Sequence, residues 1–192
     1  MDKGRLEAFS DGVIAIIITI MVLEMKAPHS PTIEAVLELW PVFLSYVVSF
    51  IYVGIYWNNH HHMMHVTERV NGRVLWANLH LLFWLSLLPF VTAWMSENHF
   101  AAAPTALYGG VLLMAAIAFP ILLRELIACN GGPTCALARA VGRDVKGKTS
   151  IFLYAIGIPL AFVSPWISCA LYLAVAAIWF VPDRRIEKVE AA

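Results

Sequence analysis

The sequence has few charged residues and few cysteines for its length. Of its 192 residues, 14% are charged and 60% are hydrophobic, whereas a soluble domain averages about 25% charged and roughly 45–50% apolar residues. A chain this short leaves a large share of its surface facing solvent, so the apolar surplus does not fit inside a core. Together with a mean hydropathy of +0.74, this places the chain in a lipid bilayer.

Other absences exclude further classes of protein. Thirteen basic residues balance thirteen acidic ones, which argues against a nucleic-acid partner. Three cysteines are too few for a disulfide framework. The sequence has no His-Glu-x-x-His, no Gly-x-Ser-x-Gly and no phosphate-binding glycine loop, so we predict neither an enzyme nor a cofactor. Glu7 and Asp11 interrupt the first apolar segment, which disfavours a cleavable signal peptide.

Long uncharged stretches are abundant. About 20 helical residues span a hydrocarbon core of about 30 Å. The last stretch, residues 149–182, would be roughly 50 Å long as one helix, and Ser164-Pro165 divides it because proline lacks a backbone donor. The sequence therefore predicts an all-α, polytopic membrane protein with six transmembrane helices in a single domain, residues 1–192. The expected spans are residues 6–25, 35–57, 74–96, 104–124, 149–164 and 166–182.

Basic residues predict the orientation of these spans. Lys and Arg residues lie before the first span, between the second and third, between the fourth and fifth, and after the sixth. On the opposite side there is only Lys26. Connections rich in Lys and Arg remain in the cytoplasm, so both termini are expected to be cytoplasmic.

One face of the first span is suited to an ion pathway. At about 3.6 residues per turn, one side of this helix is shared by Gly12, Ile16, Thr19, Ile20 and Leu23. Several copies of the helix around an axis would enclose a narrow apolar tube with one ring of hydroxyl groups. Apolar constrictions gate pores by dewetting, and hydroxyl oxygens replace part of an ion's hydration shell. Ordinary contact with lipid or with another helix is the alternative for such a face.

An acidic residue, Asp11, lies inside the same span. An ionisable group is costly there unless it is paired or faces water. The alternative is a carboxylate at the interface that binds backbone amides near the helix start. The residues alone leave both interpretations open.

Motifs in the first three spans carry a family resemblance. The first span contains Arg5-x-x-x-Phe9-Ser10-Asp11-Gly12 and then Ala15-Ile16-x-x-Thr19. Residues 54–61 read Gly-Ile-Tyr-Trp-x-Asn-His-His, and the third span contains Trp-x-Asn-Leu-x-Leu at 76–81 and Leu-Pro-Phe-x-Thr at 88–92. Across roughly residues 5–95, the chain resembles the transmembrane protein 175 family, the endolysosomal potassium channels and their bacterial relatives.

This resemblance implies a leak-type channel that conducts K⁺ passively and selectively. With one six-span repeat and one Phe-Ser-Asp motif, the chain resembles the bacterial members, which are homotetramers. The resemblance therefore implies a homotetramer in the cell membrane, the inner membrane of a bacterium. Ile16 would form the main hydrophobic gate, Thr19 the hydroxyl layer, and Ile20 and Leu23 further apolar layers. Nothing in the sequence resembles Thr-Val-Gly-Tyr-Gly, the backbone-carbonyl filter of other potassium channels.

The resemblance also implies a polar network near the cytoplasmic end of the first span. It would join the signature residues Arg5, Phe9, Ser10 and Asp11 to Trp57, Asn78 and His80 of the next two spans. Indole, amide and imidazole groups have the required donors and acceptors. His80 lies one or two positions from the place expected for the family's histidine. A carboxylate satisfied in this way would stabilise the packing around the pore.

A secondary cation or metal transporter is the alternative function. The run of histidines at 60–65 contains His61 and His65 at i and i+4, a spacing common in metal sites. The run lies just outside the second span, with Glu68 as its nearest carboxylate, so interfacial histidines are the simpler interpretation. Transporters also typically show an internal inverted repeat, which is not evident here.

Overall fold

The structure, a computed structural model, describes residues 2–142 and 144–180. Within these residues it contains helices and no strands, which confirms the predicted all-α class. The helices are α1 (Lys3–Leu23), α2 (Ile33–Leu37), α3 (Trp40–His65), α4 (Gly72–Ser86), α5 (Leu88–Glu97), α6 (Ala102–Cys129), the 3₁₀ helix η1 (Gly132–Thr134), α7 (Ala136–Val141), α8 (Val145–Leu160) and α9 (Pro165–Phe180).

Four helical stretches are long and apolar enough to cross a membrane. They are α1, α3, the nearly continuous pair α4 and α5, and α6. The last two helices, α8 and α9, have 16 residues each, or about 24 Å, which is shorter than a hydrocarbon core of about 30 Å. The structure thus has several helices fit for a bilayer, and the total of six spans stays a prediction.

Helix boundaries differ from the predicted spans where proline or a cap decides them. The long helix α3 begins at Trp40 rather than at residue 35, because Pro41 at its second position favours a helix start. It then continues to His65, beyond the predicted end at 57. Residues 149–182 divide between α8, which begins earlier behind the cap residue Asp144, and α9. Residues 181 and 182 lie outside the described residues.

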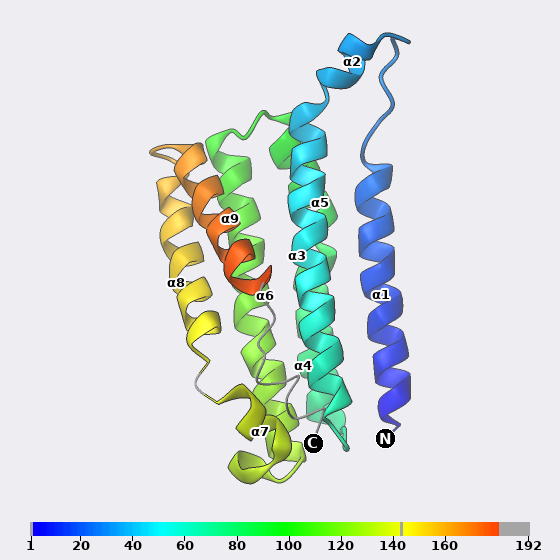
Figure 1. Cartoon of the computed structure of the whole chain (residues 1–192), viewed down its shortest axis with the longest axis vertical. Coiled ribbons are helices and arrows are strands. Elements are labelled where there is room, and N and C mark those ends of the chain that lie inside the picture. The colour runs from blue at the N-terminus through cyan, green and yellow to red at the C-terminus, as the bar shows by residue number, and fades with distance from the viewer. Residues whose placement is uncertain (1, 143, 181–192) are drawn as a thin grey trace.

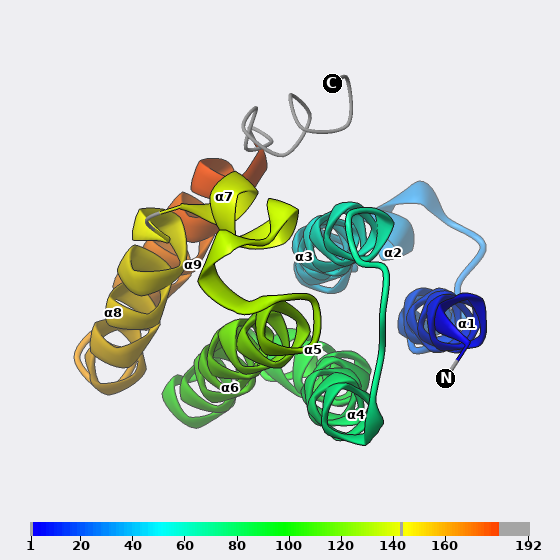
Figure 2. The ribbon, with the colours of Figure 1, turned by 90° about the horizontal axis from the view of Figure 1, so that it is seen from below.

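The long helices run side by side (Figure 1). In the middle, α6 contacts α4, α5, α8 and α9. At one edge of the bundle, α1 contacts α3, α4 and α5, and the pair α8 and α9 lies at the opposite edge (Figure 2). One side of α1 is therefore left uncovered by the other described residues.

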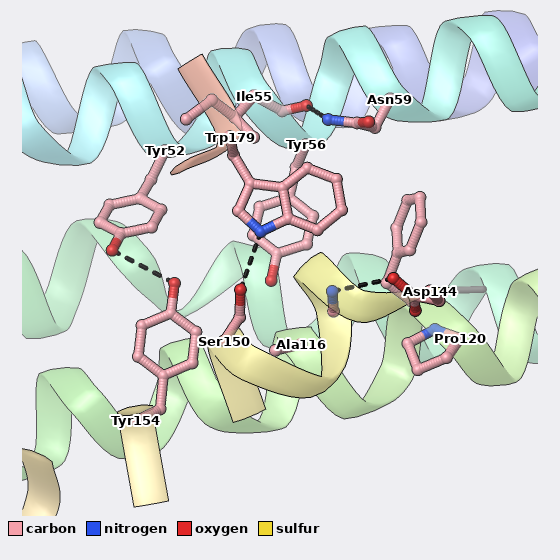
Figure 3. Close-up of a pocket in the computed structure, with 12 residues that line it drawn as sticks. Tyr52, Ile55, Tyr56, Asn59, Ala116, Pro120, Asp144, Ser150, Tyr154 and Trp179 are labelled. Atoms are coloured by element: carbon pink, nitrogen blue, oxygen red, sulfur yellow. Dashed lines mark hydrogen bonds between the residues drawn. The ribbon is translucent and has the colours of Figure 1, made fainter. Parts of the chain in front are cut away.

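A cluster of buried tyrosines joins the α8–α9 pair to the rest of the bundle. Tyr52 of α3 donates a hydrogen bond to the backbone oxygen of Tyr172 of α9. The hydroxyl of Tyr154 of α8 donates to that of Tyr52 at 3.2 Å (Figure 3). Gly109 and Gly157 leave the space that the Tyr172 ring occupies, since a Cβ at Gly157 would lie 2.7 Å from Tyr172 Cε1. Close packing at these glycines thus sets how near α9 approaches its neighbours.

We expect Gly109→Ala to destabilise the protein, because the added methyl group would overlap the buried Tyr172 hydroxyl. Overpacking of this kind lowers the free energy of unfolding by about 1–3 kcal/mol. The measurement is the melting temperature of the purified protein in detergent, which should fall. Gly110→Ala is the matched control, since its added Cβ has nothing within 4 Å and alanine favours helix. Equal melting temperatures for the two variants would contradict this account of the tyrosine cluster.

Candidate functional site

The first helix, α1, has one packed face and one exposed face. Its buried residues recur every three or four positions and are Leu6, Ser10, Ile14, Ile17 and Met21. All five residues of the predicted ion pathway lie on the exposed side, namely Gly12, Ile16, Thr19, Ile20 and Leu23. The side chain of Ile16 is 58% exposed and that of Leu23 is 75% exposed. The fold of one chain therefore leaves this face available for other contacts.

The hydroxyl group of Thr19 is oriented by its own helix. Thr19 Oγ1 donates a hydrogen bond to the backbone oxygen of Ala15, one turn earlier. A hydroxyl group has one donor and two acceptor lone pairs, so the lone pairs remain free on the exposed side. A ring of such groups presents oxygen atoms, which is the chemistry that a cation requires.

A buried polar network holds the packed face of α1. Asn78 of α4 donates from Nδ2 to Ser10 Oγ at 2.9 Å, and Ser10 in turn donates to the backbone oxygen of Leu6 at 2.8 Å. Asn78 Oδ1 lies 2.9 Å from Nε2 of His60 on α3, and because a carbonyl oxygen only accepts, this nitrogen carries the proton. The three side chains are at most 2% exposed, so the network links three helices inside the protein.

A second, more exposed set of contacts ties the same end of α1 to α3. Trp57 Nε1 donates to Asp11 Oδ1 at 3.0 Å. Nearby, Lys3 pairs with Glu7 at 3.8 Å and donates to the backbone oxygen of His65 at 3.5 Å. The cap of α1 is Asp2, which accepts from Gly4 N at 2.9 Å. In the structure, then, Asp11 has an indole partner and does not cap the helix.

The predicted polar network is assembled differently from the expectation. Ser10 and Asn78 are joined, and Asp11 and Trp57 are joined, but His80 is not among them. Its Nε2 accepts from Trp84 Nε1 of the same helix at 2.9 Å. The imidazole that contacts Asn78 belongs to His60 instead. The sequence analysis had grouped His60 with its histidine neighbours.

Arg5 and Phe9 are both exposed on α1. Within the described part of the chain, the Arg5 side chain forms no ion pair or hydrogen bond. The contacts that the family resemblance implies for these two signature residues therefore remain a prediction.

The remaining histidines of the run line the outside of α3. The ring of His61 stacks on Trp57 at 5.8 Å between centroids and on His65 at 6.4 Å. Among the residues that the structure describes, no three His, Cys, Asp or Glu side chains are grouped so that they could hold a metal ion. The i, i+4 pair of the sequence analysis is thus a stack of rings along an exposed helix face.

Comparison with known proteins decides the family. A family model described as "Endosomal/lysosomal potassium channel TMEM175" matches residues 5–89. A protein of Chryseobacterium sp. (strain P1-3), named a potassium channel, is 53% identical over 98% of this chain and 97% of its own length. The crystal structure of a lysosomal potassium-selective channel TMEM175 homolog from Chamaesiphon minutus matches with a TM-score of 0.77 and 30% identity, covering 94% of this chain and 97% of that chain. The chain belongs to the TMEM175 family.

TMEM175 proteins form a family of ion channels, not of enzymes, so the predicted absence of an enzymatic activity agrees with the family. The human member is named an endosomal/lysosomal proton channel. It is 33% identical over a segment that covers 54% of this chain and 23% of the human protein. Members are thus named for two different cations, and the choice of ion by this TMEM175 chain has to be argued from its own residues.

We expect Asn78→Ala to destabilise the protein, because it leaves Ser10 without its donor and His60 without its acceptor. Buried groups without partners cost about 1–3 kcal/mol each, measured as a lower melting temperature in detergent. Asn59→Ala is the control, since Asn59 donates to the backbone oxygen of Ile55 on its own helix at 2.8 Å. The assignment fails if the two variants melt at the same temperature.

Proposed function

We propose that this TMEM175 chain is a potassium-selective channel that conducts passively, through a pore lined by α1 of four identical subunits. One observation carries the proposal: the face of α1 that bears Ile16 and Thr19 is exposed, while the opposite face is packed against the bundle. In a family of channels, an exposed apolar face on an edge helix is suited to line a shared axis. Membership of that family supports the same assignment.

The hydrophobic constriction would be a ring of four Ile16 side chains, with Ile20 and Leu23 as further layers. Narrow apolar rings expel water, so an ion crosses them at the cost of its hydration shell. The conduction step makes and breaks no covalent bond and needs no cofactor. The rate is set by the height of the dehydration barrier.

The preference for K⁺ would come from the ring of Thr19 hydroxyls. Their oxygen lone pairs face away from the packed side of α1, since the donor is occupied by Ala15. These oxygens replace part of the water that an ion loses at the constriction. Potassium is the larger ion and gives up water more easily than sodium, so partial replacement favours potassium.

The proposed topology has six spans, with both termini in the cytoplasm. The channel lies in the cell membrane, here the inner membrane of a bacterium. The start of α1, the α3–α4 connection and α7 lie at the same end of the bundle (Figure 1). Backbone amides of Glu68 and Arg69 donate to Asn130 Oδ1 at 3.0 and 2.8 Å, which fastens the α3–α4 connection to the end of α6. Basic residues collect at this end, as cytoplasmic loops require.

We expect Ile16→Asn to raise potassium flux, because an amide side chain wets the constriction. A barrier lower by about 1.4 kcal/mol corresponds to about tenfold faster flux. The measurement is ion flux into liposomes that contain the purified channel, with potassium, sodium and proton gradients compared in turn.

The control for this variant is Ile156→Asn. Ile156 is an exposed isoleucine of α8, and α8 lies across the bundle from α1 (Figure 2), so its substitution should leave flux unchanged. Native mass spectrometry should show four copies in each case. The proposal is wrong if Ile16→Asn matches the wild type, or if flux saturates and requires exchange of a second ion, as a transporter does.

The hydroxyl ring is tested separately by Thr19→Val, which keeps the shape of the side chain and removes its oxygen. We expect the ratio of potassium to sodium flux to fall, because no lone pairs then replace the lost water. Thr19→Ser restores the oxygen and should keep a ratio near that of the wild type. Unchanged ratios in both variants would place selectivity elsewhere.

A further inference from the structure

An open groove of about 830 Å³ lies between the first half of α4 and the last part of α6. These two helices pack side by side (Figure 2). The walls of the groove include Arg73, Trp76 and His80 of α4, and Ile121 and Glu125 of α6. The groove begins at the end of the bundle where α4 starts. At about 1.5 Å per residue, the eight residues from the start of α4 to His80 extend it by about 12 Å along the bundle.

The groove contains two opposite charges that do not pair with each other. Arg73 is exposed and Glu125 is partly buried. Neither side chain forms an ion pair or a hydrogen bond with another described residue. A carboxylate that is partly removed from water is costly without a partner, so Glu125 has an open position for a cationic donor. The planar guanidinium of Arg73 has five N–H donors that match a phosphate group.

An exposed indole indicates where this groove lies in a bilayer. The side chain of Trp76 is 75% exposed, and exposed tryptophans of membrane helices collect at the level of the lipid headgroups. Ile121 lies one helical turn before Glu125 on α6 and therefore deeper in the bundle. The groove thus has its charges at headgroup level and apolar wall beneath them, which is the order of groups in a phospholipid.

The two unpaired charges distinguish between headgroups. Phosphatidylglycerol would pair with Arg73, but its net negative charge would lie beside the Glu125 carboxylate, and like charges repel. The choline group of phosphatidylcholine has no N–H to donate. Phosphatidylethanolamine carries both a phosphate and a primary ammonium group, which has three donors as in lysine. One such molecule satisfies both charges of the groove.

We propose that this groove binds a bilayer phospholipid with a zwitterionic, primary-ammonium headgroup. Its phosphate accepts hydrogen bonds from Arg73, its ammonium group donates to Glu125, and its upper acyl carbons lie against Trp76 and Ile121. Charge-assisted hydrogen bonds of this kind are about twice as strong as neutral ones. The site does not rest on the proposed pore, because α1 contributes no residue to it, and its test needs no ion conduction.

The experiment is native mass spectrometry of the full chain in detergent, titrated with phosphatidylethanolamine, phosphatidylcholine and phosphatidylglycerol that carry identical acyl chains. Bound lipids are counted per subunit. We expect one saturable site per subunit that prefers phosphatidylethanolamine about tenfold over the other two lipids. Tenfold corresponds to about 1.4 kcal/mol, the scale of one hydrogen bond to a charged group.

Two variants test the two charges separately. Arg73→Gln should weaken the binding of phosphatidylethanolamine about tenfold. Glu125→Gln should tighten the binding of phosphatidylglycerol and remove the preference for phosphatidylethanolamine, because the repelling carboxylate is gone. Neither residue has a partner to lose among the described residues, so both variants should melt like the wild type. Arg124→Gln is the matched control, since Arg124 is exposed on α6 and does not line the groove.

Several outcomes would contradict the proposal. Equal affinities for the three lipids would overturn the headgroup assignment, and so would a Glu125→Gln variant that ranks the lipids as the wild type does. A loss in Arg124→Gln as large as that in Arg73→Gln would show a general attraction to positive charge and overturn the site. If no lipid binds saturably to the wild type, the groove is not a lipid site.

Discussion

The rotation of α1 about its own axis depends on the hydrogen bonds of Asn78. Once Ser10 is held inward by this amide, the helical repeat fixes the direction of all remaining side chains of α1. Thr19 follows Ser10 by nine residues, which is two and a half turns at about 3.6 residues per turn, and therefore lies on the opposite side. Ile16 is also turned well away from the bundle. A polar contact near one end of the helix thus fixes where the proposed constriction and hydroxyl ring point.

The two faces of α1 were largely predictable, because helical periodicity in a charge-poor segment leaves little choice. The same spacing that collects Ile16, Thr19 and Leu23 on one side collects Ser10 and Ile17 on the other. Helix ends were less predictable. Residues 35–40 are mostly apolar despite Glu38, whereas the start of α3 at Trp40 is decided locally, by Pro41. No Asp, Glu, Lys or Arg stands between Leu39 and Thr67, and α3 continues through this stretch to His65.

The choice between His60 and His80 shows what periodicity cannot supply. Both histidines are expected at the same end of the bundle as Asn78. A shift of one residue along a helix, however, turns a side chain by about 100°. Which one faces the amide depends on how α3 and α4 are rotated against each other, and this is a tertiary property. One signal did exist: His60 continues the buried stripe of Ser49 and Val53 along α3, a stripe that its neighbours His61 and His62 leave.

The two halves of the molecule carry different kinds of information. The family model covers residues 5–89. The hydrogen bonds of Ser10, Asp11, Trp57, His60 and Asn78 that position α1 lie within that range, whereas Lys3, which donates to the backbone oxygen of His65, precedes it. The C-terminal half combines the tyrosine hydrogen bonds with close packing, in which Tyr172 lies against Gly109 and Gly157. Shape packing leaves little trace in short motifs, because many apolar sequences can build a close-packed wall. Motifs therefore identified the family from the half that orients α1, whereas the other half was foreseen only as apolar helices.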